Sequence, residues 1–203
     1  MFIEKASRKY EQRARAAKQD ETRRRIAAAT LELHEEVGPA RTTVTEVARR
    51  AGVQRLTVYN NFPDEYALIS ACQGHFMAEH PPPDPSAAFA LEDPAERLRS
   101  VLCDFYGWYR ATQRTTENVS RDRGIVPALD RRMSETADVQ QEALAGALAA
   151  GFAASGRPRK PLRAAVALAL DFWTWRRLSE EGLTDAAAAG LMVGLVRAAA
   201  SGR

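Results

Sequence analysis

The stretch TVTEVARRAGVQRLTVYNNF, Thr43–Phe62, predicts two short helices joined by a tight turn. Gly52 lies at the turn, where a positive φ costs glycine little and any residue with a Cβ much more. Apolar residues recur at helical spacing through the stretch and predict one buried face. These residues are Val44, Val47, Ala48, Ala51, Val53, Leu56, Val58 and Phe62. The pattern is typical of a helix-turn-helix.

The polar residues of the same stretch predict a surface that reads DNA. A helix-turn-helix inserts its second helix into the major groove, so residues 54–61 form the predicted recognition helix. Amide, guanidinium and hydroxyl groups are the side chains that pair with base edges and phosphates. The predicted contacts from this helix are Gln54, Arg55, Thr57, Tyr59, Asn60 and Asn61. Which of them read bases and which bind phosphates stays open.

Thr43-Val44-Thr45-Glu46 fits a capping box, in which the threonine hydroxyl and the glutamate carboxylate bond to free amides at a helix start. The first helix of the motif is therefore predicted to begin at Thr43. Because such a start also attracts anions, Thr42 and Thr43 are predicted phosphate contacts. Capping alone is the alternative, and both roles can hold together.

The flanking sequence predicts a small helical domain around this motif. A helix from about residue 21 carries an apolar stripe and stops at Gly38-Pro39. Its stripe consists of Ile26, Ala29, Thr30, Leu33 and Val37. Asp64 is a predicted N-cap for a fourth helix, and prolines from Pro81 onward end that helix. We predict a DNA-binding domain over 21–80 and a Pro-rich linker over 81–91.

Positive charge is concentrated at the start of the chain. The net charge is only +3, yet residues 1–25 contain nine Lys or Arg and four Asp or Glu. Residues 1–20 are therefore predicted to be a basic arm that neutralises DNA phosphates, with a solvated tail as the alternative. No regular structure is expected for the first dozen residues.

The second half predicts helices only, which makes the chain all-α. The expected helices begin at Asp93-Pro94 and then span about 127–153, 160–181 and 184–200, with a polar stretch at 113–124. The last two are apolar on more than one face, which a monomer of this size would struggle to cover. They predict a homodimer, since a palindromic operator requires two recognition helices. An internal core pair is the alternative.

Residues 23–70 resemble the DNA-binding domain of the TetR family of bacterial one-component transcriptional regulators. The resemblance rests on the helix ending at Gly38, on TVTEVARRAGV at 43–53, on TVYNNF at 57–62 and on Leu68, and it covers about a quarter of the chain. It implies a homodimer that pairs its last two helices about a two-fold axis. Glu65 departs from the family, which usually has a phosphate-binding lysine there. The basic arm is expected to compensate.

The resemblance also bears on a group of aromatic residues in 92–203, the predicted effector-binding and dimerisation domain. Large aromatics at helical spacing are usually core, but the family implies a cavity for a hydrophobic or aromatic effector. The residues predicted to line it are Phe105, Trp108, Tyr109, Phe172 and Trp173.

No catalytic residue, metal site or cofactor is predicted. The histidines lack the spacing of a helical metal site, and Cys72 and Cys103 form no CxxC motif and have no base nearby in sequence. Two cysteines without a disulfide framework fit a reduced, cytoplasmic compartment, and no signal peptide or membrane span is expected.

Two function classes follow from the sequence. The first is a dimeric repressor that a small hydrophobic or aromatic effector releases from a palindromic DNA operator. The alternative is a helical small-molecule-binding protein or enzyme with an incidental helix-turn-helix. Sequence-selective DNA binding with a steep salt dependence separates the two.

Overall fold

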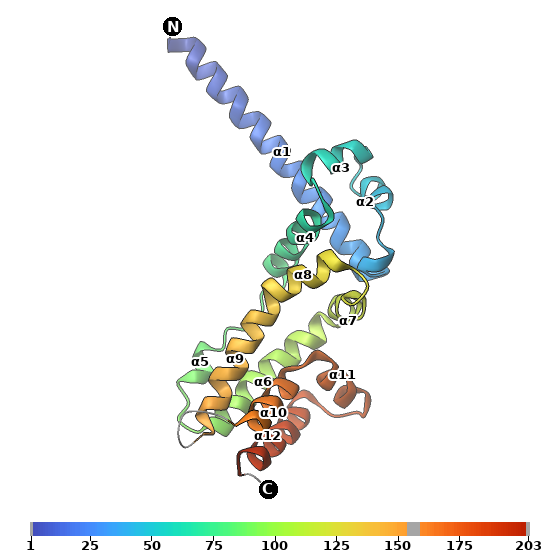
Figure 1. Ribbon diagram of the computed structural model, residues 1–203. Coiled ribbons are helices and arrows are strands. Elements are labelled where there is room, and N and C mark those ends of the chain that lie inside the picture. The colour runs from blue at the N-terminus through green and yellow to red at the C-terminus, as the bar shows by residue number, and fades with distance from the viewer. Residues whose placement is uncertain (1, 154–158, 202–203) are drawn as a thin grey trace. The chain divides into compact units, whose positions relative to one another are not determined.

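The computed structural model describes residues 2–153 and 159–201, with side chains from residue 12 onward (Figure 1). Every regular element in the described residues is helical, which confirms the all-α prediction. Contacts divide the chain into two units. The first unit contains the residues up to Pro81 together with Asn118–Arg132, and the second contains Pro82–Glu117 and the residues from Met133 onward.

The first unit is built around a long N-terminal helix, α1 (Phe2–Glu36). A short 3-10 turn, η1 (Pro39–Arg41), leads to the motif helices α2 (Val44–Arg50) and α3 (Arg55–Asn61), and α4 (Glu65–Glu79) packs along α1 (Figure 1). The end of α7 (Gln113–Asp122) and the start of α8 (Pro127–Glu135) complete it.

The expectation that the first dozen residues lack regular structure was wrong, because α1 begins at Phe2. Residues 12–20 are all exposed, so this part of the helix has no apolar stripe that a sequence pattern could reveal. Alanine, arginine, lysine, glutamate and glutamine are good helix formers and extend the packed part of α1 outward.

The core of the first unit joins α1 to the helix-turn-helix. It contains the buried residues Ile26, Ala29, Leu33, Val47, Ala48, Ala51, Val58, Phe62 and Leu68. Leu56, which was predicted in this core, is 65% exposed. It lies two positions before buried Val58, and at 3.6 residues per turn the two side chains point to nearly opposite sides of α3.

The structure confirms the predicted turn and caps. Gly52 has a φ of +64°. The side chains of Thr43, Asp64 and Asp93 accept hydrogen bonds from the amides of Glu46, Ala67 and Ala95, at 3.2, 2.7 and 3.0 Å. Each of these residues precedes the first residue of its helix, which is the N-cap position.

The second unit contains six complete helices among its described residues, which are α5 (Ser86–Phe89), α6 (Pro94–Ala111), α9 (Ala137–Gly151), α10 (Lys160–Leu170), α11 (Phe172–Glu180) and α12 (Asp185–Ser201). Helix α12 packs against α6 and α10, and α10 packs against α9.

Three expectations for the second half need correction. The helix predicted over 127–153 is interrupted at Thr136, with φ −128° and ψ −81°, and the helix predicted over 160–181 is interrupted at Asp171, with ψ 135°. The polar stretch at 113–124, for which no secondary structure was predicted, forms α7. Residues 118–132, predicted within the C-terminal domain, pack in the first unit.

The break at Asp171 has a visible cause. The hydroxyls of Tyr106 and Tyr109 on α6 donate to the carbonyl oxygens of Ala169 and Leu170, both at 2.7 Å. These bonds satisfy carbonyls that a helix end leaves without a partner. Asp171 then accepts from the amide of Thr174 at 2.9 Å and begins α11.

Among the described residues, no helix combines the length and apolar content that crossing a bilayer requires.

Candidate nucleic-acid interface

Two arginines of α1 hold the helix-turn-helix in place. The guanidinium of Arg25 donates to the carbonyl oxygens of Ala51 and Gly52, at 2.5 and 3.4 Å. Arg23 donates to the carbonyl oxygen of Asn61 and stacks over the ring of Phe62, 4.4 Å from its centroid. These two cations, which the sequence grouped with the basic segment, therefore stabilise the turn and the end of α3 through contacts within the protein.

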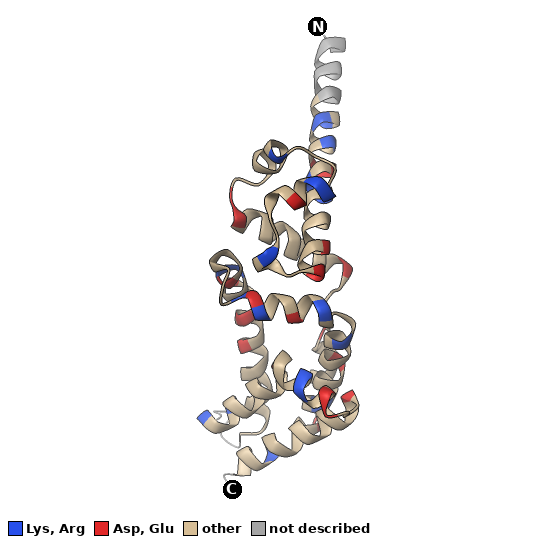
Figure 2. Ribbon diagram, turned by 90° about the vertical axis from the view of Figure 1, so that its right-hand side faces the viewer, with Lys and Arg blue, Asp and Glu red and all other residues tan. Residues whose placement is uncertain are grey.

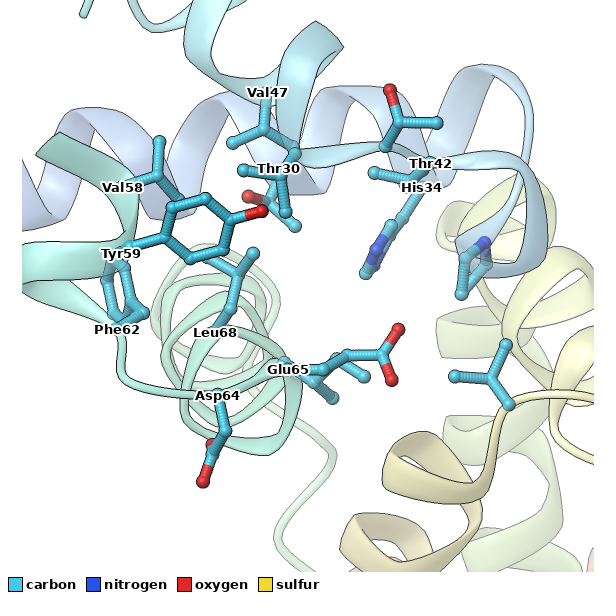
Figure 3. Close-up of a pocket in the computed structure, with 15 residues that line it drawn as sticks. Thr30, His34, Thr42, Val47, Val58, Tyr59, Phe62, Asp64, Glu65 and Leu68 are labelled. Atoms are coloured by element: carbon cyan, nitrogen blue, oxygen red, sulfur yellow. The ribbon is translucent and has the colours of Figure 1, made fainter. Parts of the chain in front are cut away.

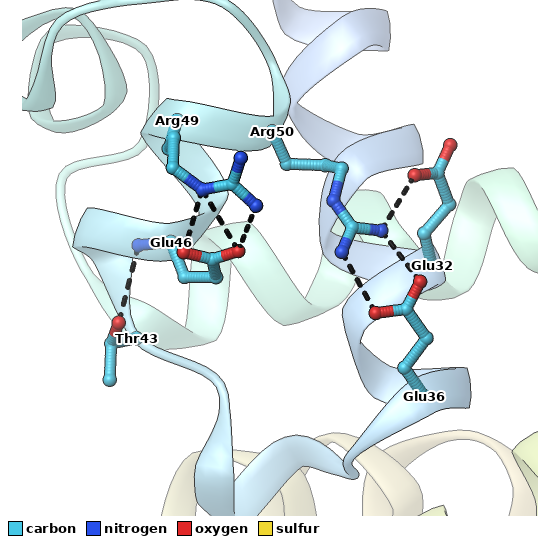
Figure 4. Close-up of polar contacts among 6 residues, drawn as sticks. All are labelled: Glu32, Glu36, Thr43, Glu46, Arg49 and Arg50. Carbon is cyan, nitrogen blue, oxygen red and sulfur yellow. Dashed lines mark hydrogen bonds and ion pairs between the residues drawn. The ribbon is translucent and has the colours of Figure 1, made fainter.

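A second anchor ties the end of α2 to α1 (Figure 4). The guanidinium of Arg50 donates to both carboxylate oxygens of Glu36 at 2.8 Å and to Glu32 at 3.1 Å. These carboxylates raise the pKa of Arg50, and the exposed positions of Glu32 and Glu36 keep the energetic gain small. Because two hydrogen bonds to one carboxylate fix the orientation of the guanidinium, this contact also orients the end of α2.

The carboxylate of Glu46 pairs with Arg49 at 2.5 Å instead of contributing the side-chain half of a capping box (Figure 4). The Thr43 hydroxyl oxygen accepts the capping hydrogen bond from the amide of Glu46. Because the oxygen is the acceptor in that bond, the hydroxyl proton can still be donated to another group. Thr43 is exposed, whereas Thr42 is half-buried and donates to the carbonyl oxygen of Gly38 at 2.9 Å.

The predicted recognition helix presents most of its polar residues to solvent. Gln54, Arg55 and Asn60 are exposed, and Tyr59 is 49% exposed. Thr57 is half-buried. The exposed Leu56 lies among these residues, so the surface of α3 carries an apolar group that the sequence had assigned to the core.

The prediction for Asn61 needs correction. Its side chain is buried, and its amide nitrogen donates to the carbonyl oxygen of Thr57 at 2.7 Å. Asn61 is at the end of α3, where the chain turns toward α4, and α1 reaches it through Arg23. Its side chain is therefore not available to a base edge in this structure.

Charge near the motif is mixed rather than uniformly positive (Figure 2). Arg13, Arg15 and Lys18 are exposed on α1, and further along the helix Arg24 pairs with Glu21 at 2.6 Å. Glu65, the first residue of α4, is exposed and adds a negative charge at the position where the family usually has a lysine.

A cavity of about 180 Å³ lies beside Tyr59, and the side chains of His34 and Glu65 point toward it (Figure 3). His34 is buried, with its Nδ1 3.5 Å from the sulfur of Cys72. Burial lowers the pKa of His34 to about 4, although the charge of Asp122 acts in the opposite direction.

Sequence reasoning missed the contact between His34 and Cys72, because 38 positions separate the two residues. Burial raises the pKa of Cys72 to about 12, so the thiol and the imidazole are both neutral at neutral pH. A nucleophilic cysteine needs a thiolate, and this pair does not provide one. Among the described residues, no three His, Cys, Asp or Glu side chains gather as a metal site.

The aromatic residues predicted to line an effector pocket mostly pack against one another. Tyr109 and Phe172 are buried, with ring centroids 5.4 Å apart, and both contact Trp175. Phe105 and Trp108 are half-buried, and Trp173 is 44% exposed.

A separate cavity of about 370 Å³ lies between α9 and α10 of the second unit. It is lined by Asp138, Gln141, Glu142, Ala145, Gly146, Arg163, Ala164 and Ala167. None of the five predicted aromatics contributes to this lining.

A helix-turn-helix whose second helix exposes polar side chains is the arrangement by which DNA-binding proteins read the major groove. Residues 26–72 match the model of the bacterial regulatory proteins of the tetR family. The fold is similar to the crystal structure of a TetR-like transcriptional regulator from Rhodococcus sp. RHA1, with a TM-score of 0.64, 18% identity, and coverage of 90% of this chain and 97% of that one. No curated protein matches the sequence.

The matched segment, residues 26–72, thus agrees with the resemblance to the TetR DNA-binding domain over residues 23–70.

Proposed function

We propose that the protein is a dimeric repressor that binds a palindromic operator and releases it when a small hydrophobic or aromatic effector binds the second unit. The observation that supports this proposal best is the exposed face of α3, where Gln54, Arg55, Tyr59 and Asn60 have no part in the core.

Each exposed group on this face has a chemical counterpart in the major groove. Asn60 and Gln54 can bond to the N6 and N7 edge of adenine, and Arg55 can bond to guanine or a phosphate. Leu56 adds an apolar group of the kind that contacts the methyl of thymine. Thr57 and Tyr59 complete the proposed surface, and the hydroxyls of Thr42 and Thr43 are proposed phosphate contacts.

The proposed dimer uses the apolar residues that the second unit leaves exposed. Leu191 and Leu195 lie four positions apart, on one side of α12, and are 47% and 49% exposed. Leu168 on α10 is also exposed. Large apolar side chains exposed on neighbouring helices favour association with a second copy, and a two-fold dimer supplies the second recognition helix.

The proposed effector acts through a difference in affinity. A ligand shifts a conformational equilibrium only when it binds one state more tightly, so the effector must prefer the state that cannot bind DNA. Phe105, Trp108 and Trp173 are the predicted pocket residues that a ligand can reach, whereas Tyr109 and Phe172 would first have to leave the core. A thermal-shift screen of small hydrophobic compounds would identify ligands.

Selection of binding sites from random-sequence DNA duplexes, followed by a salt series on the selected site, tests the DNA-binding part of the proposal. We expect an inverted repeat and a steep fall in affinity with salt. Arg55→Ala should weaken binding about tenfold or more, since a contact to guanine contributes about 1–3 kcal/mol. Arg114→Ala removes the same charge from an exposed position outside the first unit and should bind as the wild type does. Enrichment of no sequence would refute the proposal.

A further inference from the structure

The connection between α1 and α2 is held from the side by α7. Helix α1 ends near Gly38, whose φ is +90°, and the chain passes through η1 to Thr43. Within the connection, the amides of Arg41 and Thr42 donate to the carbonyl oxygens of Gly38 and Pro39. The amide of Ala40 donates instead to the carboxylate of Asp122, at 2.9 Å.

Asp122, the last residue of α7, is a buried carboxylate. Its side chain is almost fully covered, and the residue is 2% exposed. Burial alone would raise its pKa, but hydrogen bonds from Arg121 and from the Ala40 amide outweigh burial and hold the pKa below its usual range. The Arg121 guanidinium is 2.7 Å from the carboxylate. The charge is therefore kept, and one of its partners is the backbone of the connection.

Asn118, one turn earlier on α7, holds the end of α1 itself. Its side-chain nitrogen donates to the carbonyl oxygens of His34 and Glu35, at 3.0 and 2.8 Å. The carbonyls at the end of a helix have no partner within it, so this amide acts as an external cap. Its oxygen accepts from Arg121 at 2.8 Å, which joins Asn118 to the same group of side chains.

Gly38 lies against the side chains of Arg121 and Asp122 at the end of α7. A Cβ at this position would overlap the Arg121 guanidinium and the Asp122 carboxylate. Glycine is therefore favoured at residue 38 by its positive φ, and a larger residue would also displace the side chains of Arg121 and Asp122. Gly38, which follows the end of α1, thus lies against residues that are more than eighty positions later in the chain.

We propose that Asp122 and Asn118 are positioning residues for DNA binding, which hold the connection of residues 38–42 so that the Thr43 hydroxyl and α3 contact the same DNA simultaneously. This proposal rests on the proposed function. Thr43 accepts a bond from Glu46 but keeps its own proton available for a phosphate oxygen. If the connection moved freely, the Thr43 hydroxyl would occupy a range of positions, and its hydrogen bond to the phosphate would be weakened.

The test compares Asp122→Ala with Asp122→Asn in the full-length protein. Asparagine keeps an oxygen that accepts from the Ala40 amide, whereas alanine leaves that amide without a partner. We expect Asp122→Ala to weaken binding to the selected DNA about tenfold, as expected for losing a hydrogen bond to a charged group. We expect Asp122→Asn to restore most of the loss. Asp93→Ala, which removes a carboxylate that caps α6 in the second unit, is the matched control.

DNA containing single methylphosphonates separates positioning from a general loss of stability. With the wild type, neutralising the phosphate that Thr43 contacts should weaken binding. With Asp122→Ala the same replacement should have no further effect, while phosphates contacted by α3 stay sensitive. A uniform loss across all phosphates, or an equal loss for the asparagine and alanine variants, would overturn the proposal.

Amide hydrogen exchange gives a result that does not depend on DNA. Asp122→Ala should accelerate exchange at Ala40, Arg41 and Thr42 and leave the amides of α3 unchanged. If Asp122→Ala fails to fold, Asn118→Ala serves the same comparison from the neighbouring contact. Unchanged exchange would refute the positioning role even if DNA binding is confirmed. If the wild type selects no DNA sequence, the proposed function is refuted. The exchange rates at residues 40–42 would still show whether Asp122 holds the connection.

Discussion

His34 should make the stability of the first unit depend on pH. Burial lowers the pKa of its imidazole from 6.5 to about 4. In the unfolded chain the ring takes up a proton below about pH 6.5, whereas the folded protein resists protonation until about pH 4. The unfolded state therefore binds more protons between these values, and folding stability falls as the pH falls through this window.

The size of the effect follows from the two pKa values. One pKa unit corresponds to about 1.4 kcal/mol, so the full window is worth about 3 kcal/mol and the step from pH 7 to pH 5 about 2 kcal/mol. Asp122 is the charged group that acts on His34, and its lowered pKa keeps it ionised throughout this step. Asp122 therefore does not change the pH dependence of the folding stability between pH 7 and pH 5.

The measurement is amide exchange of buried positions in α1 and α4, at pH 7 and pH 5, for the wild type and His34→Gln. Glutamine does not titrate, so the variant should lose about 2 kcal/mol less than the wild type. Trp108, Trp173 and Trp175 all lie in the second unit, so the tryptophan fluorescence of both proteins provides an internal control. An equal pH dependence in both proteins would refute the reasoning about His34.

Three further changes test other parts of the structure. Gly52→Ala should destabilise the first unit by about 1–2 kcal/mol, because alanine pays for the left-handed backbone that φ +64° requires, and urea denaturation would measure the loss. Tyr106→Phe should cost about 1–3 kcal/mol, because it leaves the buried Ala169 carbonyl without its donor; thermal unfolding with little change would contradict this. Leu191→Glu with Leu195→Glu should yield monomers by sedimentation, and a persistent dimer would place the interface elsewhere.

Local signals predicted the helix caps and the turn of the helix-turn-helix well, because they depend on neighbouring residues. Caps at Thr43, Asp64 and Asp93 and the turn at Gly52 each follow from residue chemistry within a few positions, and the structure has all four. Leu56 was assigned wrongly because its apolar character does not decide which side of α3 it faces, and it points away from buried Val58.

Long-range contacts were not predictable in the same way. Asp122 is 82 positions from Ala40, and no periodicity in α7 indicates that its polar residues serve another helix. The breaks at Thr136 and Asp171 also lie in stretches whose apolar spacing continues through them. At Asp171 the cause is a pair of tyrosine hydroxyls from α6, which a window of neighbouring residues cannot include.

The clustering of Tyr109 and Phe172 illustrates a different limit. Sequence spacing placed aromatic residues on two helices and left open whether they form core or line a cavity. The structure buries these two rings against Trp175. Phe105, Trp108 and Trp173 contact the same cluster and keep part of their surface exposed.

The sequence discontinuity of the first unit bears on protein engineering. One way to engineer a regulator with a new specificity is to join the DNA-binding segment of one protein to the ligand-binding segment of another. Here a graft that ends at Pro81 would leave behind Asn118–Arg132, and with it the partner of the Ala40 amide. A hybrid made from this chain should therefore transplant both pieces, or choose a recipient whose own helix offers an acceptor to that amide.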